Sequence, residues 1–129
     1  MIKKEELSAN SLAFLGDALY ALEVKKHIIF NGYQKTNTLT KYINYYCSAK
    51  SQALIFNLLL NEAFFNEKDL EIYKLGRNKI KHIPKNGDLK TYMCASGFEA
   101  LIAYLYLNDK NKYQELITLI FKLRDIKEV

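Results

Sequence analysis

The segment SLAFLGDALYAL, residues 11–22, has the pattern of a buried helix and decides how the rest of the chain is interpreted. Its leucines at positions 12, 15, 19 and 22 recur at the spacing of one helix face, and it contains no proline. The remaining faces are apolar as well, and a helix that is apolar all round is normally enclosed by other elements. Asp17 is the single charge in this segment, roughly opposite the leucines.

A second segment far down the chain repeats this arrangement. Residues 93–107, MCASGFEALIAYLYL, are apolar or small except for Glu99. A buried carboxylate must be paired, protonated or bound to a metal. Two interpretations remain open at this point. Each acid separately caps a loop or pairs with a lysine, or the two acids meet at one helix crossing and hold Mg²⁺ or Mn²⁺, which prefer oxygen ligands.

Composition favours one all-α domain spanning residues 1–129, with a core from about residue 8 to residue 123. Half of the residues are hydrophobic, and the single proline and five glycines are too few turn-forming residues for a fold of many short strands. Periodicity and caps predict about six helices, with Thr36 or Asn37 capping the second. The first helix is expected to run from a cap at Ser8, Asn10 or Ser11 to about residue 29, and the second to about residue 46. The next three are expected at about 49–62, 67–76 and 89–107, with Ser48, Asn66 and Asp88 as caps and a break at Asn108 and Asp109, and a last amphipathic helix has its apolar positions between residues 113 and 123.

Several classes of protein are disfavoured by the sequence. No apolar run reaches transmembrane length, and the charged N-terminus is unlike a signal peptide. Cys47 and Cys94 both lie in apolar, helix-like surroundings, so we expect them to be reduced and the protein to be cytoplasmic, with no membrane partner. The net charge of +5 permits a polyanionic partner without requiring one.

Two places carry candidate phosphate-binding groups. The only clear loop, residues 77–87, is rich in basic and amide side chains, which are suited to phosphate contacts but also common on plain solvated loops. The start of the third helix carries a lysine where the helix dipole does not favour one. The candidates are Ser48, Lys50, Arg77, Asn78, Lys79, Lys81 and Lys85.

The motifs resemble those of the ribonuclease III family. FLGDAL at 14–19 is similar to the family's signature helix, and FEALIAYLYL at 98–107 is similar to its second acidic helix. YCSAKSQA at 46–53, GRN at 76–78 and PKN at 84–86 resemble the Mini-III branch, a bacterial catalytic domain that stands alone. The similarity runs in consistent order over about residues 8–123.

This resemblance implies a Mg²⁺-dependent endoribonuclease, with Mn²⁺ as a substitute, that cleaves double-stranded RNA and leaves 5′-phosphates. Asp17 and Glu99 match the family's metal-binding, catalytic acids. The resemblance also implies a homodimer, the stem of the large-subunit (23S) ribosomal RNA precursor as substrate, and leaves room for an assisting ribosomal protein. It predicts no separate double-stranded-RNA-binding domain, so the candidate residues above would bind the substrate.

The chain departs from full-length ribonuclease III at three positions. Asn10, Ala13 and Ser96 stand where that pattern has further acids. Fewer carboxylates imply a metal shell completed by water, RNA phosphate or amide oxygens, with Asn10 as one neutral donor. The missing acids keep an alternative open, a non-catalytic module that binds structured RNA. A structural helical protein without an RNA partner is a second alternative.

Overall fold

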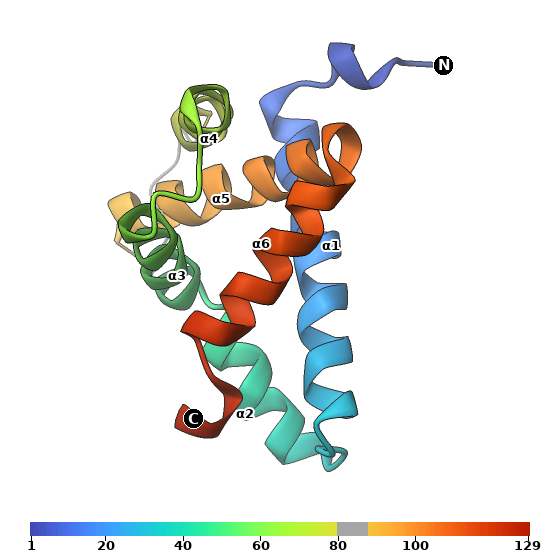
Figure 1. Ribbon diagram of the computed structural model, residues 1–129, viewed down its shortest axis with the longest axis vertical. Coiled ribbons are helices and arrows are strands. Elements are labelled where there is room, and N and C mark those ends of the chain that lie inside the picture. The colour runs from blue at the N-terminus through green and yellow to red at the C-terminus, as the bar shows by residue number, and fades with distance from the viewer. Residues whose placement is uncertain (80–87) are drawn as a thin grey trace.

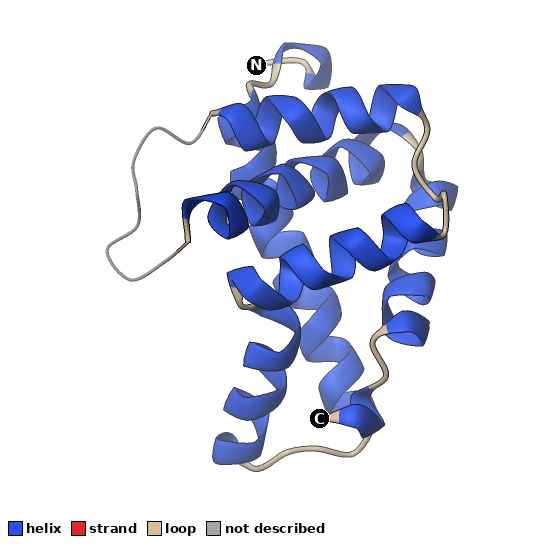
Figure 2. Ribbon diagram, turned by 90° about the vertical axis from the view of Figure 1, so that its left-hand side faces the viewer, coloured by secondary structure: helices blue, strands red, loops and turns tan. Residues whose placement is uncertain are grey.

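The computed structural model describes residues 1–79 and 88–129, and these two ranges form helices and loops without a strand (Figures 1 and 2). The six α-helices within these ranges are α1 (Ala9–Phe30), α2 (Thr36–Cys47), α3 (Ala49–Asn61), α4 (Glu67–Asn78), α5 (Leu89–Asn108) and α6 (Lys110–Leu123). Two short 3-10 helices, η1 (Lys4–Glu6) and η2 (Ile126–Glu128), flank them. The predicted all-α, six-helix architecture is therefore confirmed. Within the described ranges, none of the helices combines the length and hydropathy required to span a bilayer.

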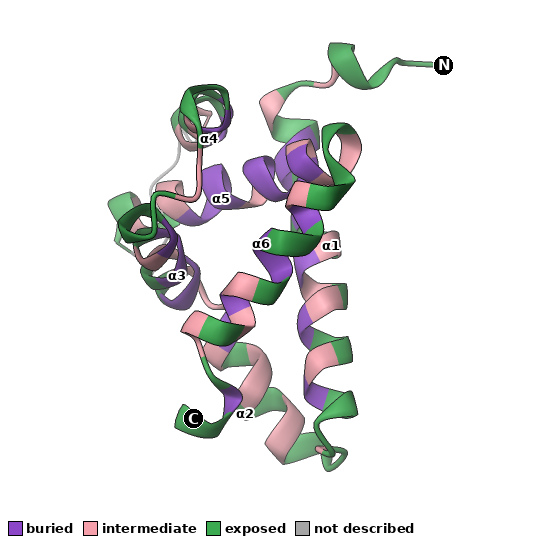
Figure 3. Cartoon of the chain, viewed as in Figure 1, coloured by how far each residue is buried: buried purple, intermediate pink, exposed green. Residues whose placement is uncertain are grey.

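Helix α5 lies at the centre of the molecule and packs against α1, α3, α4 and α6. Most residues from Ala95 to Leu105 are buried, and purple dominates the middle of α5 in Figure 3. Phe98, Leu101, Ile102 and Leu105 are among its side chains in the main core. The nearly uniform apolar composition of residues 93–107 thus follows from enclosure by four neighbouring helices.

The crossing of α1 and α5 is unusually close. A Cβ atom added at Gly16 would lie 1.7 Å from the carbonyl oxygen of Glu99, so only glycine allows the two backbones to meet there. The buried face of α1 runs through Gly16, Tyr20, Val24 and Ile28, spaced four residues apart. The leucine stripe only partly follows this face, since Leu22 is 56% exposed. Contact with α5 selects the face that carries glycine, because large side chains would hold the helices apart.

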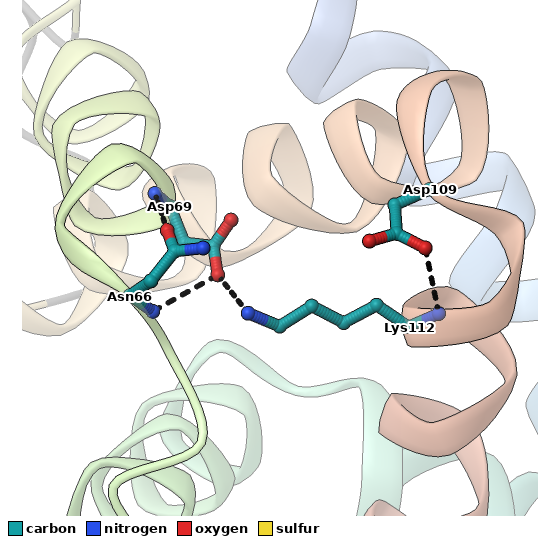
Figure 4. A network of polar contacts seen from close by, with 4 residues as sticks. All are labelled: Asn66, Asp69, Asp109 and Lys112. Carbon is teal, nitrogen blue, oxygen red and sulfur yellow. Dashed lines mark hydrogen bonds and ion pairs between the residues drawn. The ribbon is translucent and has the colours of Figure 1, made fainter.

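Helices α4 and α6 are joined by a buried ion pair (Figure 4). Lys112 Nζ lies 2.6 Å from Asp69 Oδ2, and the side chains of Lys112 and Asp69 are only 19% and 3% exposed. The same carboxylate accepts a hydrogen bond from the backbone N–H of Asn66, whose own side chain caps α4 in return. Asp69 therefore both starts α4 and attaches it to the first turn of α6.

The helix starts follow the local sequence at most positions. Ser8 and Ser48 accept hydrogen bonds from the backbone N–H groups of Ser11 and Ser51, and so cap α1 and α3. The cap predicted for the second helix is wrong. Thr36 already lies inside α2, and Lys35 occupies the cap position without a side-chain hydrogen bond.

Candidate active site

A cavity of about 370 Å³ opens between α1, α3, α5 and the end of α4, and we call it the acidic cavity. Asp17 reaches it from α1 and Glu99 from α5, so both sequence-predicted acids border the same space. Their meeting follows from the crossing at Gly16, because the residue next to this glycine is brought beside the turn of α5 that carries Glu99. The other lining residues are Ala13, Phe14, Cys47, Ala49, Gln52, Lys79, Tyr92, Ala95 and Ser96.

The two acids differ in environment. Asp17 is exposed in the isolated chain, so the expectation that both carboxylates are buried is wrong for this one. Glu99 is half-buried. Burial raises the pKa of Glu99 to about 7, and the nearby Asp17 carboxylate adds to the rise through hydrogen bonding and charge repulsion. A divalent cation between the two acids would relieve this repulsion.

Gln52 is the principal neutral contact of Glu99. Its Nε2 donates hydrogen bonds to Oε2 of Glu99, at 3.4 Å, and to the carbonyl oxygen of Cys47, at 3.0 Å. The first of these contacts favours the charged carboxylate and lowers the pKa of Glu99, against the effect of burial. Gln52 thereby connects α5 to the corner between α2 and α3.

Lys79 is the nearest positive group on the cavity wall. Its charge also lowers the pKa of Glu99, yet within residues 1–79 and 88–129 no ion pair forms with Glu99 or Asp17. Instead Lys79 Nζ donates a hydrogen bond to Oδ1 of Asn10, at 3.1 Å. One interpretation of the sequence had each acid paired with a lysine. The described part of the chain contains no such pair for Asp17 or Glu99.

Ser96 and Cys47 also line the cavity, and their side chains are respectively hydrogen-bonded to the backbone and uncharged. The Ser96 hydroxyl donates to the carbonyl oxygen of Gly76, at 3.2 Å, and so connects α5 to α4. Burial, aided by the charges of Asp17 and Glu99, raises the pKa of Cys47 to about 12. The thiol is therefore protonated at neutral pH and is no nucleophile.

The donors present fit a hard, water-rich cation site. Two carboxylates border the cavity, and Mg²⁺ commonly takes one or two protein carboxylates and retains several waters. Clusters of three or more acids, histidines or cysteines are absent from the described part of the chain. A site of this kind depends on water and on phosphate oxygens for the rest of its coordination shell.

The candidate RNA-binding residues fall at three places. Lys79 lines the acidic cavity, whereas Arg77 and Asn78 line a second cavity of about 710 Å³ between α3, α4 and α5. Lys50 is exposed in the first turn of α3, and the Ser48 hydroxyl is occupied by capping that helix. The last two candidates, Lys81 and Lys85, lie outside the described residues.

Sequence reasoning missed two members of the site. Gln52 lies in a motif that contributed to the resemblance, but its burial at 4% exposure could not be deduced from a polar residue in a first helical turn. Tyr92 borders the cavity from the first turn of α5 and is 48% exposed. Its only sequence signal is its position seven residues, or two helical turns, before Glu99.

Comparison with known proteins places the chain in a family. The model of the ribonuclease III domain matches residues 10–110. Among curated proteins, Mini-ribonuclease 3 of Streptococcus pneumoniae is 41% identical over 110 residues, which cover 84% of this chain and 86% of the relative. Mini-ribonuclease 3 of Enterococcus faecalis is 36% identical over 92% of this chain and 91% of the relative.

A solved structure agrees with these matches. The crystal structure of a Fusobacterium nucleatum protein superimposes with a TM-score of 0.79 at 33% identity, covering 91% of this chain and 93% of the other. The sequence match and the shared helical architecture therefore extend over the same region. The chain belongs to the ribonuclease III family, in its Mini-ribonuclease 3 branch, and is an endoribonuclease.

Proposed function

We propose that the chain hydrolyses phosphodiester bonds of double-stranded RNA in a Mg²⁺-dependent reaction, with Asp17 and Glu99 as the metal-binding, catalytic acids. Residues 8–123 form the catalytic domain in this proposal. The observation that carries it is the acidic cavity, where carboxylates from α1 and α5 meet without a cation of the described chain paired to either. Mn²⁺, which also prefers oxygen donors, is the expected substitute.

The chain contributes charge and position to the reaction. When bound, the divalent cation supplies activation of water and stabilisation of the charge that develops on the phosphate. Asp17 and Glu99 hold that cation through their oxygens, and the α1–α5 crossing at Gly16 fixes the spacing of their backbones. Hydrolysis adds water across the P–O3′ bond, so the products are a 5′-phosphate and a 3′-hydroxyl.

The substrate would be held by basic and amide groups around the cavity. Lys79 borders the cavity itself, and Arg77 and Asn78 face the adjoining hollow between α3, α4 and α5. Lys50 lies exposed at the start of α3. Recognition of an A-form duplex depends largely on phosphates, 2′-hydroxyls and shape, for which such groups are sufficient. Ser48, Lys81 and Lys85 complete the proposed RNA-binding set.

The proposed physiological substrate is the paired stem of the 23S ribosomal RNA precursor, processed in the cytoplasm with or without a ribosomal protein. Support comes from the resemblance to the Mini-III branch and from the net charge of +5, which suits a polyanionic ligand. RNA prepared with the ends of this stem and an unrelated duplex of equal length would measure the preference directly.

We further propose that the protein acts as a homodimer joined through α1. Phe14 is 84% exposed although it borders the acidic cavity, and Leu22, two turns further along the helix, is 56% exposed. Burial of such a stripe against the same stripe of a second copy satisfies an isologous two-fold interface. The acidic cavities of the two copies would then lie on either side of the paired α1 helices, and each would cleave one strand of the same duplex.

A cleavage assay on a long RNA duplex tests the proposed function. Wild-type protein should cut with Mg²⁺ and not with EDTA, whereas Asp17→Asn and Glu99→Gln should bind the duplex but leave it intact, because each change keeps the shape and removes ligand charge. Wild-type rates in either variant would refute the assignment of these acids. Duplex that is held tightly but never cut by wild-type protein would favour a non-catalytic RNA-binding module, and the absence of salt-dependent binding would favour a purely structural protein.

A further inference from the structure

Gln52 is a buried amide at the edge of the acidic cavity, and its burial is costly. The residue is 4% exposed, and its Oε1 is buried without a hydrogen-bond donor in the described part of the chain. A buried acceptor left unpaired costs about 1–3 kcal/mol. An apolar side chain of the same length would fill this space without that penalty, so packing alone gives no reason for an amide here.

The orientation of the amide is determined by its neighbours. Nε2 faces two acceptors, the carbonyl oxygen of Cys47 at 3.0 Å and Oε2 of Glu99 at 3.4 Å. Rotating the amide by half a turn would place Oε1 against these two oxygens, which is unfavourable. The donor end therefore belongs at Glu99, and the unpaired Oε1 is the cost of keeping it there.

We propose that Gln52 is a positioning residue for the cation site: its Nε2 anchors one oxygen of Glu99 to the α2–α3 corner and holds the carboxylate in the rotamer that faces Asp17. Ligand carboxylates are commonly oriented by hydrogen bonds from such neighbouring groups, whose loss typically lowers metal affinity or activity by about 10–100-fold. The inference rests on the proposed role of Glu99 as a metal ligand. It adds a third helix, α3, to a site otherwise built from α1 and α5.

A direct metal-binding measurement tests this role without RNA or cleavage. Gln52→Met keeps the length of the side chain and removes the donor. We expect its Mn²⁺ dissociation constant, measured from the EPR signal of free Mn²⁺, to rise by about 10–100-fold relative to wild type. Ile55→Val serves as the control, because Ile55 is fully buried one turn further along α3 and does not line the cavity. It should bind Mn²⁺ as wild type does.

A double-mutant cycle separates positioning from a general effect on the fold, since Gln52 also contacts Cys47. In the Glu99→Gln background, adding Gln52→Met should change the Mn²⁺ dissociation constant by less than about twofold, because the residue through which it acts has lost its ligand charge. Wild-type affinity in Gln52→Met, or an equal loss in both backgrounds, would overturn the inference. If Asp17→Asn and Glu99→Gln also bind Mn²⁺ like wild type, the proposed cation site itself fails, and the inference fails with it.

Discussion

Replacing Gly16 with alanine should separate the two carboxylates of the acidic cavity, Asp17 and Glu99. The added methyl carbon would lie 1.7 Å from the carbonyl oxygen of Glu99 and 2.5 Å from its carbonyl carbon. Both obstacles are backbone atoms inside helix α5, so no side-chain rotation can relieve the contact. An ordinary contact is at least 3.4 Å, so α1 and α5 must move apart locally by about 1.7 Å.

The expected loss of activity is larger than the loss of stability. Overpacking a core costs about 1–3 kcal/mol, and the better helix propensity of alanine returns up to about 1 kcal/mol of this. A misplacement of about 1 Å in a catalytic group can reduce the rate by about 100-fold. We therefore expect Gly16→Ala to remain mostly folded at low temperature while its kcat/KM for duplex RNA falls by about 100-fold or more.

The assay compares cleavage per folded molecule, with the folded fraction measured by circular dichroism at the same temperature. Gly76→Ala is the matched control, because its methyl group would clash at the α4–α5 crossing, 2.6 Å from the Cβ of Ala100, and not at Glu99. It should lose stability to a similar degree and retain much more activity. Equal residual activity in the two variants, or wild-type activity in Gly16→Ala, would refute the claim that this crossing sets the spacing of the acids.

Three further predictions concern pH, stability and assembly. Burial and Asp17 raise the pKa of Glu99 from 4.5 to about 7, so the metal-free fold should lose stability as pH rises from about 4.5 to about 7. Glu99→Gln should flatten this part of the profile in urea unfolding with EDTA, and a profile unchanged by the substitution would contradict the prediction. Asp69→Ala breaks a buried ion pair and a capping box, so the free energy of unfolding in urea should fall by about 3–5 kcal/mol. The control Glu71→Ala removes an exposed pair and should cost less than about 1 kcal/mol, and similar losses in the two variants would show that burial of the pair is unimportant. Phe14→Lys places a charge on the most exposed aromatic position of α1 and should convert a dimer to a monomer in sedimentation, and an unchanged mass would exclude this face as the interface.

Much of the fold is encoded in local patterns. Most helix ends are located to within about two residues by periodicity, by the caps Ser48 and Asn66 and by the break at Asn108, because each signal acts over one or two turns. For the first helix the sequence left three caps open, and the structure selects Ser8. The cap of α2 is the exception. That helix starts at Thr36 without any capping side chain, so no local signal marked its first residue.

The site was predicted less completely than the fold. The two acids could be identified because each interrupts an apolar helix, and their meeting is observed. The buried face of α1 and the burial of Gln52 could not be predicted from the sequence, because both depend on which neighbour packs against the helix. The same leucine periodicity is compatible with a crossing at Leu22 or at Gly16, and only the close contact with α5 decides between them.

The enclosure of α5 has a consequence for how the molecule opens. A helix covered by four neighbours exchanges its central amide hydrogens only when most of the protein unfolds. We therefore expect the amide of Glu99 to be among the slowest to exchange, and the amide of Asp17 to be protected with it, because Asp17 follows Gly16 at the α1–α5 crossing even though its side chain is exposed. Both walls of the acidic cavity are therefore tied to the global fold, the α5 wall by its four neighbours and the α1 wall by the close backbone contact of Gly16 with Glu99.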